Sequence, residues 1–201
     1  MMPVNVLIEG RSDESVAKHL LRHVGLEVGA VYGSKGKAYL LKRLPNYNRA
    51  AQFTPWFGII DLDTEPCAAQ AIGLWLPQPA KGMRFRIAIR TVEAWLIADR
   101  ERMATFLAVS PSRLPPYPEQ EANPKEILIN IARHSRSSSI REDILPRQGS
   151  GAKIGPLYVA RLNEFTEKHW RPEVAAQCSD SLLRCIRALS ALEAWNAEAA
   201  P

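Results

Sequence analysis

Cysteine is scarce in this chain, and the few cysteines present do not form metal-binding pairs. The 201 residues include three, Cys67, Cys178 and Cys185. No two of them are spaced as CxxC, and no histidine stands at metal-ligand spacing from them. This pattern argues against a structural zinc site and favours a reducing compartment in which the cysteines remain buried thiols.

Long hydrophobic runs are also lacking. The apolar run Val4 to Ile8 is too short for the hydrophobic part of a signal peptide, and it leads directly into Glu9. The longest uncharged stretch, Pro66 to Ala80, is interrupted by Gln and Pro and cannot span a bilayer. We therefore expect a cytoplasmic protein with no membrane partner.

A strong excess of charge of either sign is absent. Lys and Arg number 26 and Asp and Glu 21, which gives a formal net charge of +5. This mild excess permits a polyanionic partner without requiring one, because a solvated basic surface explains it as well. The hydrophobic fraction of 46% and the charged fraction of 23% are ordinary for a globular protein.

The first half of the chain alternates short apolar runs with amphipathic segments. We predict strands at residues 4–8, 28–32, 56–60 and 85–89, with helices between them and a helix from about 92 to 99. Pro45 is expected to end the second helix. In the fourth strand, Arg84 and Arg86 alternate with Phe85, Ile87 and Ile89. Strands that alternate with helices predict an α/β fold with a mainly parallel four-stranded sheet.

The composition changes after about Pro111, where prolines cluster before three further helical segments. These helices are expected near residues 125–133, 156–170 and 179–195. We therefore predict an α/β core at residues 1–108 and a helical C-terminal extension at 109–201 that packs on the core.

Four acidic residues follow predicted strands. Glu9 follows the first strand, Asp61 and Asp63 the third, and Glu93 the fourth. Ligands of open α/β sheets bind at the carboxyl ends of the strands, so these acids are expected to gather at one sheet edge. Mg²⁺ binds one or two carboxylates together with water and phosphate oxygens. The pattern predicts a divalent-metal site in which Glu9 is a further ligand or a general acid/base.

The segments Leu7-Ile-Glu-Gly-Arg-Ser-Asp13 and Gly58-Ile-Ile-Asp-Leu-Asp-Thr-Glu65 resemble the Toprim domain, with its strand–Glu–Gly and Asp-x-Asp motifs. The resemblance covers about residues 4–100. The segment Arg90-Thr-Val-Glu-Ala-Trp-Leu-Ile-Ala-Asp99 and the glycine-rich stretch further on look like a bacterial family of Toprim-like proteins of unknown function (DUF4276). That family is related to the Toprim nuclease half of the overcoming-lysogenization-defect proteins, whose ATPase half this sequence lacks.

The resemblance implies a Rossmann-like Toprim core and Mg²⁺- or Mn²⁺-dependent cleavage of phosphodiester bonds in DNA or RNA, in defence against phage or mobile elements. A separate ATPase would be a partner. By motif match Glu9 would be the general acid/base, Asp61 and Asp63 the metal ligands, and Glu65 a weaker third acid. Glu93 has no counterpart in the general motif, but related nucleases have an extra downstream acid that could hold a second metal.

Each acidic signal has a simpler explanation when it stands alone. An isolated Asp-x-Asp pair is most often a solvated turn after a strand. Glu93 would also suit the first turn of a helix, where an acid is favourable with the helix dipole. The combination of both motifs with the matching order of strands and helices favours the metal site.

Basic residues suggest where a nucleic acid would bind. Lys35 and Lys37 lie in a glycine-containing loop before a helix and could meet phosphates, or could form only a basic surface loop. Lys153 follows Gly149 and Gly151 and could stabilise charge at the reacting phosphate, or could belong to a flexible connector. The nearby arginines could follow the phosphate backbone or form a solvated face; they are Arg133, Arg136, Arg141 and Arg147.

Two other functions fit the same residues. One is a non-catalytic module with the Toprim fold that binds nucleic acid or a protein partner. The other is a phosphatase or phosphotransferase acting on a small molecule, with Asp61 as nucleophile. The phosphatase or phosphotransferase is the least favoured of the three functions, because the Ser/Thr-then-Lys motifs expected for it are missing.

Overall fold

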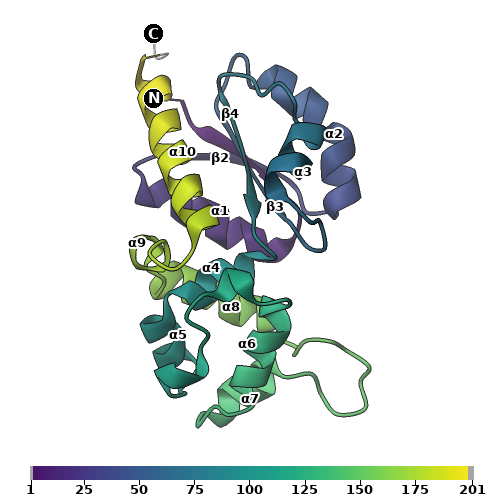
Figure 1. The fold of residues 1–201 in the computed structure, drawn as a ribbon, viewed down its shortest axis with the longest axis vertical. Helices are drawn as coiled ribbons and strands as arrows, with labels where there is room; N and C mark the ends of the chain where they lie inside the picture. The colour runs from purple at the N-terminus through teal and green to yellow at the C-terminus, as the bar shows by residue number, and fades with distance from the viewer. Residues whose placement is uncertain (1, 199–201) are drawn as a thin grey trace. The chain divides into compact units, whose positions relative to one another are not determined.

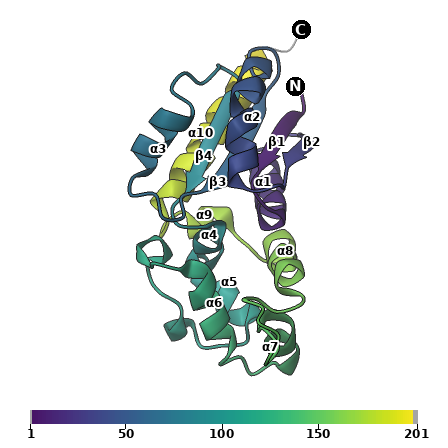
Figure 2. The same cartoon turned by 90° about the vertical axis from the view of Figure 1, so that its right-hand side faces the viewer.

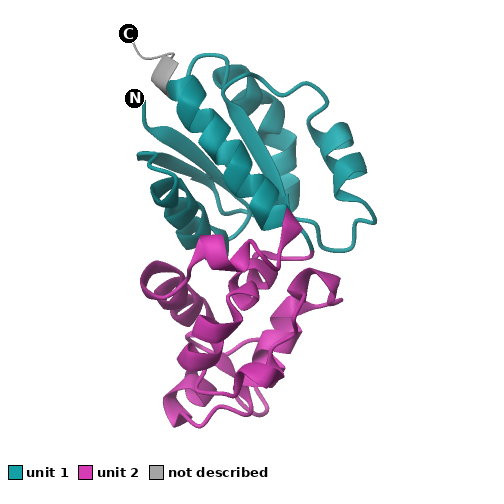
Figure 3. Ribbon diagram, turned by 60° about the vertical axis from the view of Figure 1, so that its left-hand side comes forward, with its two compact units in different colours: residues 1–89, 181–201 teal, residues 90–180 magenta. Residues whose placement is uncertain are grey.

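The computed structural model describes residues 2–198, and the chain forms two compact units (Figure 3). Unit 1 comprises residues 1–89 and 181–201, and unit 2 comprises residues 90–180. This division differs from the predicted boundary after residue 108. The helices at residues 92–106 belong with the helical unit, and the last helix of the chain belongs with the sheet.

Unit 1 is built on a four-stranded parallel sheet. Its strands are β1 (Val4–Ile8), β2 (Val28–Gly33), β3 (Trp56–Asp61) and β4 (Met83–Ala88), in the order β2-β1-β3-β4. All three pairings are parallel. Helices cover both faces, so the two central strands are almost continuously apolar. The predicted α/β fold is confirmed, and the layout is consistent with a Rossmann-like arrangement.

Four helices flank this sheet (Figure 1). Helices α2 (Lys37–Ala50) and α3 (Ala68–Trp75) lie on one face, while α1 (Arg11–His23) and α10 (Asp180–Glu198) lie on the other (Figure 2). Leu40 and Leu44 of α2 pack with Phe85 of β4 in the core on the first face. On the second face, α10 is tied to the outer strand because Arg84 Nε donates to the carbonyl of Ala188 at 3.0 Å.

The prediction that Pro45 ends the second helix is wrong, because α2 continues to Ala50. Leu44 before the proline and Tyr47 after it both pack in the core beneath the helix. A proline inside a helix costs roughly 3 kcal/mol. Burial of apolar side chains on both sides of Pro45 offsets that cost.

Unit 2 is entirely helical in its regular structure. Its elements are α4 (Val92–Ala98), α5 (Arg100–Phe106), α6 (Pro124–Ala132), α7 (Ser138–Ile144), α8 (Tyr158–Lys168) and α9 (Pro172–Ala175), with the short 3₁₀ helices η1 (Pro111–Arg113) and η2 (Pro118–Gln120). Helix α4 forms the centre of unit 2, and every one of its residues is therefore buried. The Trp170 indole donates to the Trp95 carbonyl at 3.2 Å, and Asp99 is buried against Arg171.

No helix within residues 2–198 is both long enough and apolar enough to cross a membrane.

Candidate active site

The loops at the carboxyl ends of the strands in unit 1 hold strained backbone positions. At the end of β2, Gly33 has a φ of +106°, and a Cβ at this position would lie 2.1 Å from the carbonyl oxygen of Ile8, so only glycine fits. Ser34 and Asp63 adopt left-handed φ values of 59° and 54°. Such strain costs about 1–3 kcal/mol per residue and tends to gather at functional sites.

Glu9 follows β1 and is the most unusual acid of this edge. Its carboxylate accepts a hydrogen bond from the backbone N–H of Asp61, while its Oε2 atom is buried without a hydrogen-bond partner. Burial raises the pKa of Glu9, and the negative charges of Asp63 and Asp13 raise it further. Lys37 and the Asp61 N–H oppose this rise. The carboxyl group therefore favours either a proton or a nearby cation.

The Asp-x-Asp segment continues the line of β3. Asp61 pairs with Ala88 of β4 and is partly buried, whereas Asp63 is exposed in the loop beyond. Asp61 and Asp63 influence Glu9 in different ways, the first through its backbone N–H and the second through its charge. The structure thus brings all three predicted residues to the same edge of the sheet.

Lys37 lies within this acidic loop. Its ammonium group donates to the carbonyls of Asp61 at 2.8 Å and Leu62 at 3.3 Å, and it pairs with Asp63 Oδ2 at 3.1 Å. It also lies 5.0 Å from the centre of the Trp75 ring, a cation–π contact. The sequence suggested Lys37 as a surface contact to phosphate, but its ammonium is directed into the site.

Asp13 of α1 is a further acid of this cluster, and the sequence analysis did not count it among the site residues. It is buried, and its Oδ2 accepts from the Gly10 N–H at 2.8 Å while its Oδ1 accepts from the Ser12 hydroxyl at 3.2 Å. Its charge also raises the pKa of Glu9. The signal available in the sequence was its position four residues after Glu9, at the start of the helix that follows the same strand.

The three predicted carboxylates do not form a closed cage. Among residues 2–198, no group of three or more His, Cys, Asp or Glu side chains is arranged to hold a metal ion. Even so, the unpartnered Oε2 of Glu9 and the hard oxygen donors of Asp61 and Asp63 have the chemistry that suits Mg²⁺. Such an ion commonly completes its shell with water and substrate phosphate.

Glu65 and Glu93, the two weaker candidates, lie in different surroundings. Glu65 is exposed in the loop after Asp63. Glu93 belongs to unit 2, where its side chain is 1% exposed. Its Oε1 accepts from the Tyr158 hydroxyl at 3.2 Å and lies 3.4 Å from Lys125 Nζ, whereas its Oε2 is buried without a hydrogen bond. Glu93 therefore already has a cationic partner in its own unit.

Lys153 is exposed in unit 2, where it lines a hollow of about 370 Å³ together with Lys125, Asn130 and Arg133. Lys35 lies 5.2 Å from the centre of the Tyr39 ring in unit 1.

The remaining predicted basic contacts belong to unit 2. Arg136 is exposed, and Arg141 Nη1 donates to the Ser135 carbonyl. Arg141 and Arg147 line a second hollow together with Asp143. The negative charge of Asp143 reduces the attraction of this second hollow for phosphate.

Comparison with protein-family models, with curated proteins and with solved structures finds no match for this chain. The resemblance to Toprim domains accordingly stays a prediction that rests on the two motifs and their strands.

Proposed function

We propose that this protein is a metal-dependent nuclease that hydrolyses phosphodiester bonds at the edge formed by Glu9, Asp61 and Asp63. The observation that carries the proposal is the Glu9 carboxyl group, whose pKa is raised and whose Oε2 is buried without a partner beside two aspartates. Perturbed carboxyl groups at the carboxyl ends of parallel strands are typical of catalytic sites.

In this proposal the aspartates, Glu9 and Lys37 have different roles in the reaction. Asp61 and Asp63 would hold Mg²⁺ or Mn²⁺, which lowers the pKa of bound water and offsets the charge of the phosphate. Glu9, whose pKa is raised, retains a proton to a higher pH than an ordinary glutamate, so it suits proton donation to the leaving oxygen. Lys37 is fixed by two carbonyls and Asp63 and adds positive charge near the phosphate.

The proposal is tested by comparing Asp63→Asn with Glu27→Gln. Glu27 is exposed and directly precedes β2, so it lies at the opposite end of the sheet from Asp63. Supercoiled plasmid, single-stranded DNA and structured RNA are each incubated with the proteins in Mg²⁺ and in Mn²⁺. We expect wild type and Glu27→Gln to cut at least one substrate and Asp63→Asn to lose this activity. Equal cutting by all three proteins, or no cutting by any, would overturn the proposal.

Lys37 favours a second candidate function, a module that binds nucleic acid without cutting it. Its ammonium already neutralises Asp63, as a built-in counter-charge would in a site without a metal. This alternative predicts salt-sensitive binding of nucleic acid with no turnover in either metal. Thermal melting with and without Mn²⁺ separates the two functions, because a metal that binds the folded state raises the melting temperature.

A further inference from the structure

Strand β4 is the outer strand of the sheet, so one of its backbone edges has no partner strand within residues 2–198. The carbonyls of Gly82 and Ala88 accept hydrogen bonds from backbone N–H groups at the two ends of β3. Carbonyls alternate in direction along a strand. The carbonyls of Met83 and Phe85 therefore face the free edge.

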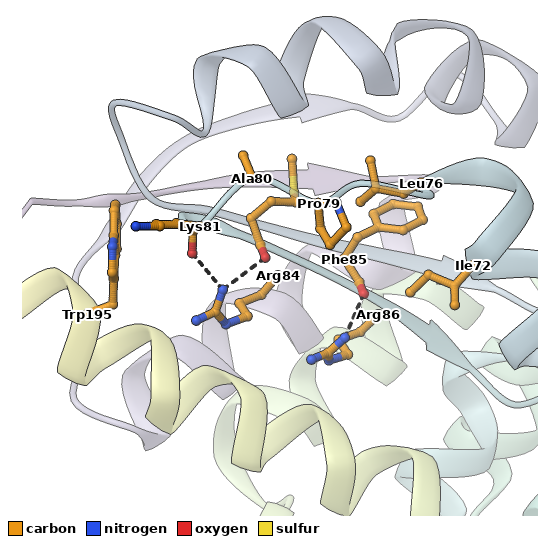
Figure 4. A pocket seen from close by; sticks show the side chains of 10 residues that line it. Ile72, Leu76, Pro79, Ala80, Lys81, Arg84, Phe85, Arg86 and Trp195 are labelled. Carbon is orange, nitrogen blue, oxygen red and sulfur yellow. Dashed lines mark hydrogen bonds between the residues drawn. The ribbon is translucent and has the colours of Figure 1, made fainter.

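Two arginines wrap around this edge. Arg84 Nη1 donates to the Met83 carbonyl and Arg86 Nη1 to the Phe85 carbonyl, both at 3.1 Å. Arg84 Nη1 also donates to the Lys81 carbonyl at 2.8 Å (Figure 4). The backbone carbonyls thus hold both guanidinium groups in fixed positions along the edge.

No described carboxylate neutralises either guanidinium. Within the described part of the chain, Arg84 and Arg86 donate only to backbone carbonyls and pair with no carboxylate. The Nε atom of Arg86 is buried without an acceptor. Burial lowers the pKa of both arginines, and the positive charge of Arg86 lowers that of Arg84 further. Both arginines are partly buried, and a charge partly withdrawn from water is stabilised by an opposite charge, so this edge would attract an anion.

The two arginines line a hollow of about 450 Å³ (Figure 4). Lys81 adds a third positive charge, Trp195 of α10 stands at one end, and Ile72 and Leu76 supply apolar surface. Among the described side chains, no Asp or Glu lines the hollow. Positive side chains beside an aromatic ring and apolar surface form the combination that binds the phosphates and bases of a single nucleic-acid strand.

The strand register relates the two arginines to the candidate active site within unit 1. Arg86 is the register partner of Ile59, and Asp61 follows two residues later on β3. Side chains two residues apart lie on the same face, roughly 7 Å apart along the strand. Arg84 lies a further two residues back. A strand bound along the two arginines would thus be directed at the carboxylates.

We propose that the free edge of β4 binds a single strand of nucleic acid, with successive phosphates on Arg84 and Arg86 and a base against Trp195. This inference builds on the proposed function, because it assigns the substrate a path to the acidic edge. An extended peptide added to β4 as a fifth strand fits less well. The outward carbonyls of Met83 and Phe85 already accept hydrogen bonds from the arginines, and an added strand would have to displace them.

Edge protection is the simpler role for the same arginines, because charged side chains on outer strands prevent unwanted strand pairing. Edge protection and phosphate binding predict different results when the arginines are replaced by an uncharged residue. Glutamine at positions 84 and 86 can still donate to the edge carbonyls but carries no charge. If the arginines only protect the edge, the double variant Arg84→Gln/Arg86→Gln should behave like a variant with a distant substitution. If they bind phosphate, the double variant should lose that binding.

The experiment measures fluorescence anisotropy of labelled oligonucleotides of roughly 15 nucleotides, about one to a few binding sites in length. Single-stranded DNA, single-stranded RNA and a blunt DNA duplex are compared in EDTA, so that no cleavage intervenes. The proteins are wild type, Arg84→Gln/Arg86→Gln, Lys81→Gln, Trp195→Leu and the control Arg22→Gln. Arg22 is exposed near the end of α1 and lies outside the hollow.

We expect the double variant to bind single strands at least about tenfold more weakly and the slope of log K against log salt to fall by roughly 0.7 per lost phosphate contact. Lys81→Gln, an exposed change that leaves the fold intact, should show a smaller loss with the same sign. Trp195→Leu should weaken binding without changing the slope. Arg22→Gln should bind as wild type does.

The inference is overturned if the double variant and Lys81→Gln both bind like wild type, if the duplex is preferred to either single strand, or if polyglutamate of equal charge competes as well as the oligonucleotide. Because binding is measured without metal, the result does not depend on cleavage. A protein that cuts through Asp63 but binds independently of the two arginines would keep the proposed function and lose this inference.

Discussion

Each unit of this protein contains a glutamate with one buried carboxylate oxygen that has no hydrogen-bond partner among residues 2–198, yet the surroundings of the two differ: Glu9 is partly buried and Glu93 is fully buried. Glu9 in unit 1 lies near the charges of Asp63 and Asp13, which raise its pKa. The charge of Lys37 lowers that pKa without forming an ion pair with Glu9. Glu93 in unit 2 has a hydroxyl donor and a direct ion pair with Lys125. The same residue type thus lies beside other acids in one place and pairs with a lysine in the other. Local charge, more than burial, distinguishes a catalytic candidate from a structural acid.

Replacing each glutamate by glutamine should produce the largest difference between the two sites. We expect Glu9→Gln to reduce cleavage by about 100-fold or more, because a general acid/base contributes that much. Glu93→Gln should leave cleavage close to wild type and cost less than about 1 kcal/mol, since the half-exposed Lys125 loses only a weak ion pair. Initial rates and urea unfolding measure the two effects. A loss of activity in Glu93→Gln that equals that of Glu9→Gln would show that the second acid also works in the reaction.

The glycine loops of the two units provide the next comparison. Gly33→Ala places a methyl group against the Ile8 carbonyl at a positive φ, so we expect a loss of at least about 2 kcal/mol in the free energy of unfolding. Gly149→Ala in unit 2 has a φ of +77° but open space around it, and should cost only about 1 kcal/mol. Urea denaturation measures both. Equal losses would mean that the loop after β2 adapts more than its close contact suggests.

The smallest effect concerns pH and the charge of Glu9. Because the pKa of Glu9 is raised in the folded state, the folded protein holds this proton where the unfolded chain has released it. Its contribution is therefore favourable below about pH 4.5, the ordinary value, and is lost as the pH rises through the folded pKa. Glu9→Gln should gain melting temperature relative to wild type as the pH rises above about 4.5.

The variant Lys37→Gln tests the same pH dependence of the melting temperature in a second way. Lys37 lowers the pKa of Glu9, so its removal should move the pH range of this change upward. A melting-temperature difference between wild type and Glu9→Gln that does not vary with pH would contradict the raised pKa.

The sequence predicted unit 1 better than unit 2, for physical reasons. The strands of the sheet are short apolar runs between turn residues, and the acids follow them directly, so local pattern locates both. In unit 2, α7 begins in a run of serines and α9 spans four residues, and neither has enough apolar periodicity to be recognised. The course of α2 through Pro45 was missed because packing on both sides of the proline is a long-range effect.

The sequence alone determined the parallel α/β character of unit 1 and the placement of Glu9, Asp61 and Asp63 at the ends of strands. Both follow from the alternation of strands and helices, which is local. The tertiary structure was needed to show that Lys37 enters the acidic loop, that the charge of Asp13 raises the pKa of Glu9, and that α10 returns to the sheet. It also decided that Arg84 and Arg86 border a free edge, since this depends on β4 being the outer strand. These features arise between segments far apart in the chain, where no local pattern records which groups will meet.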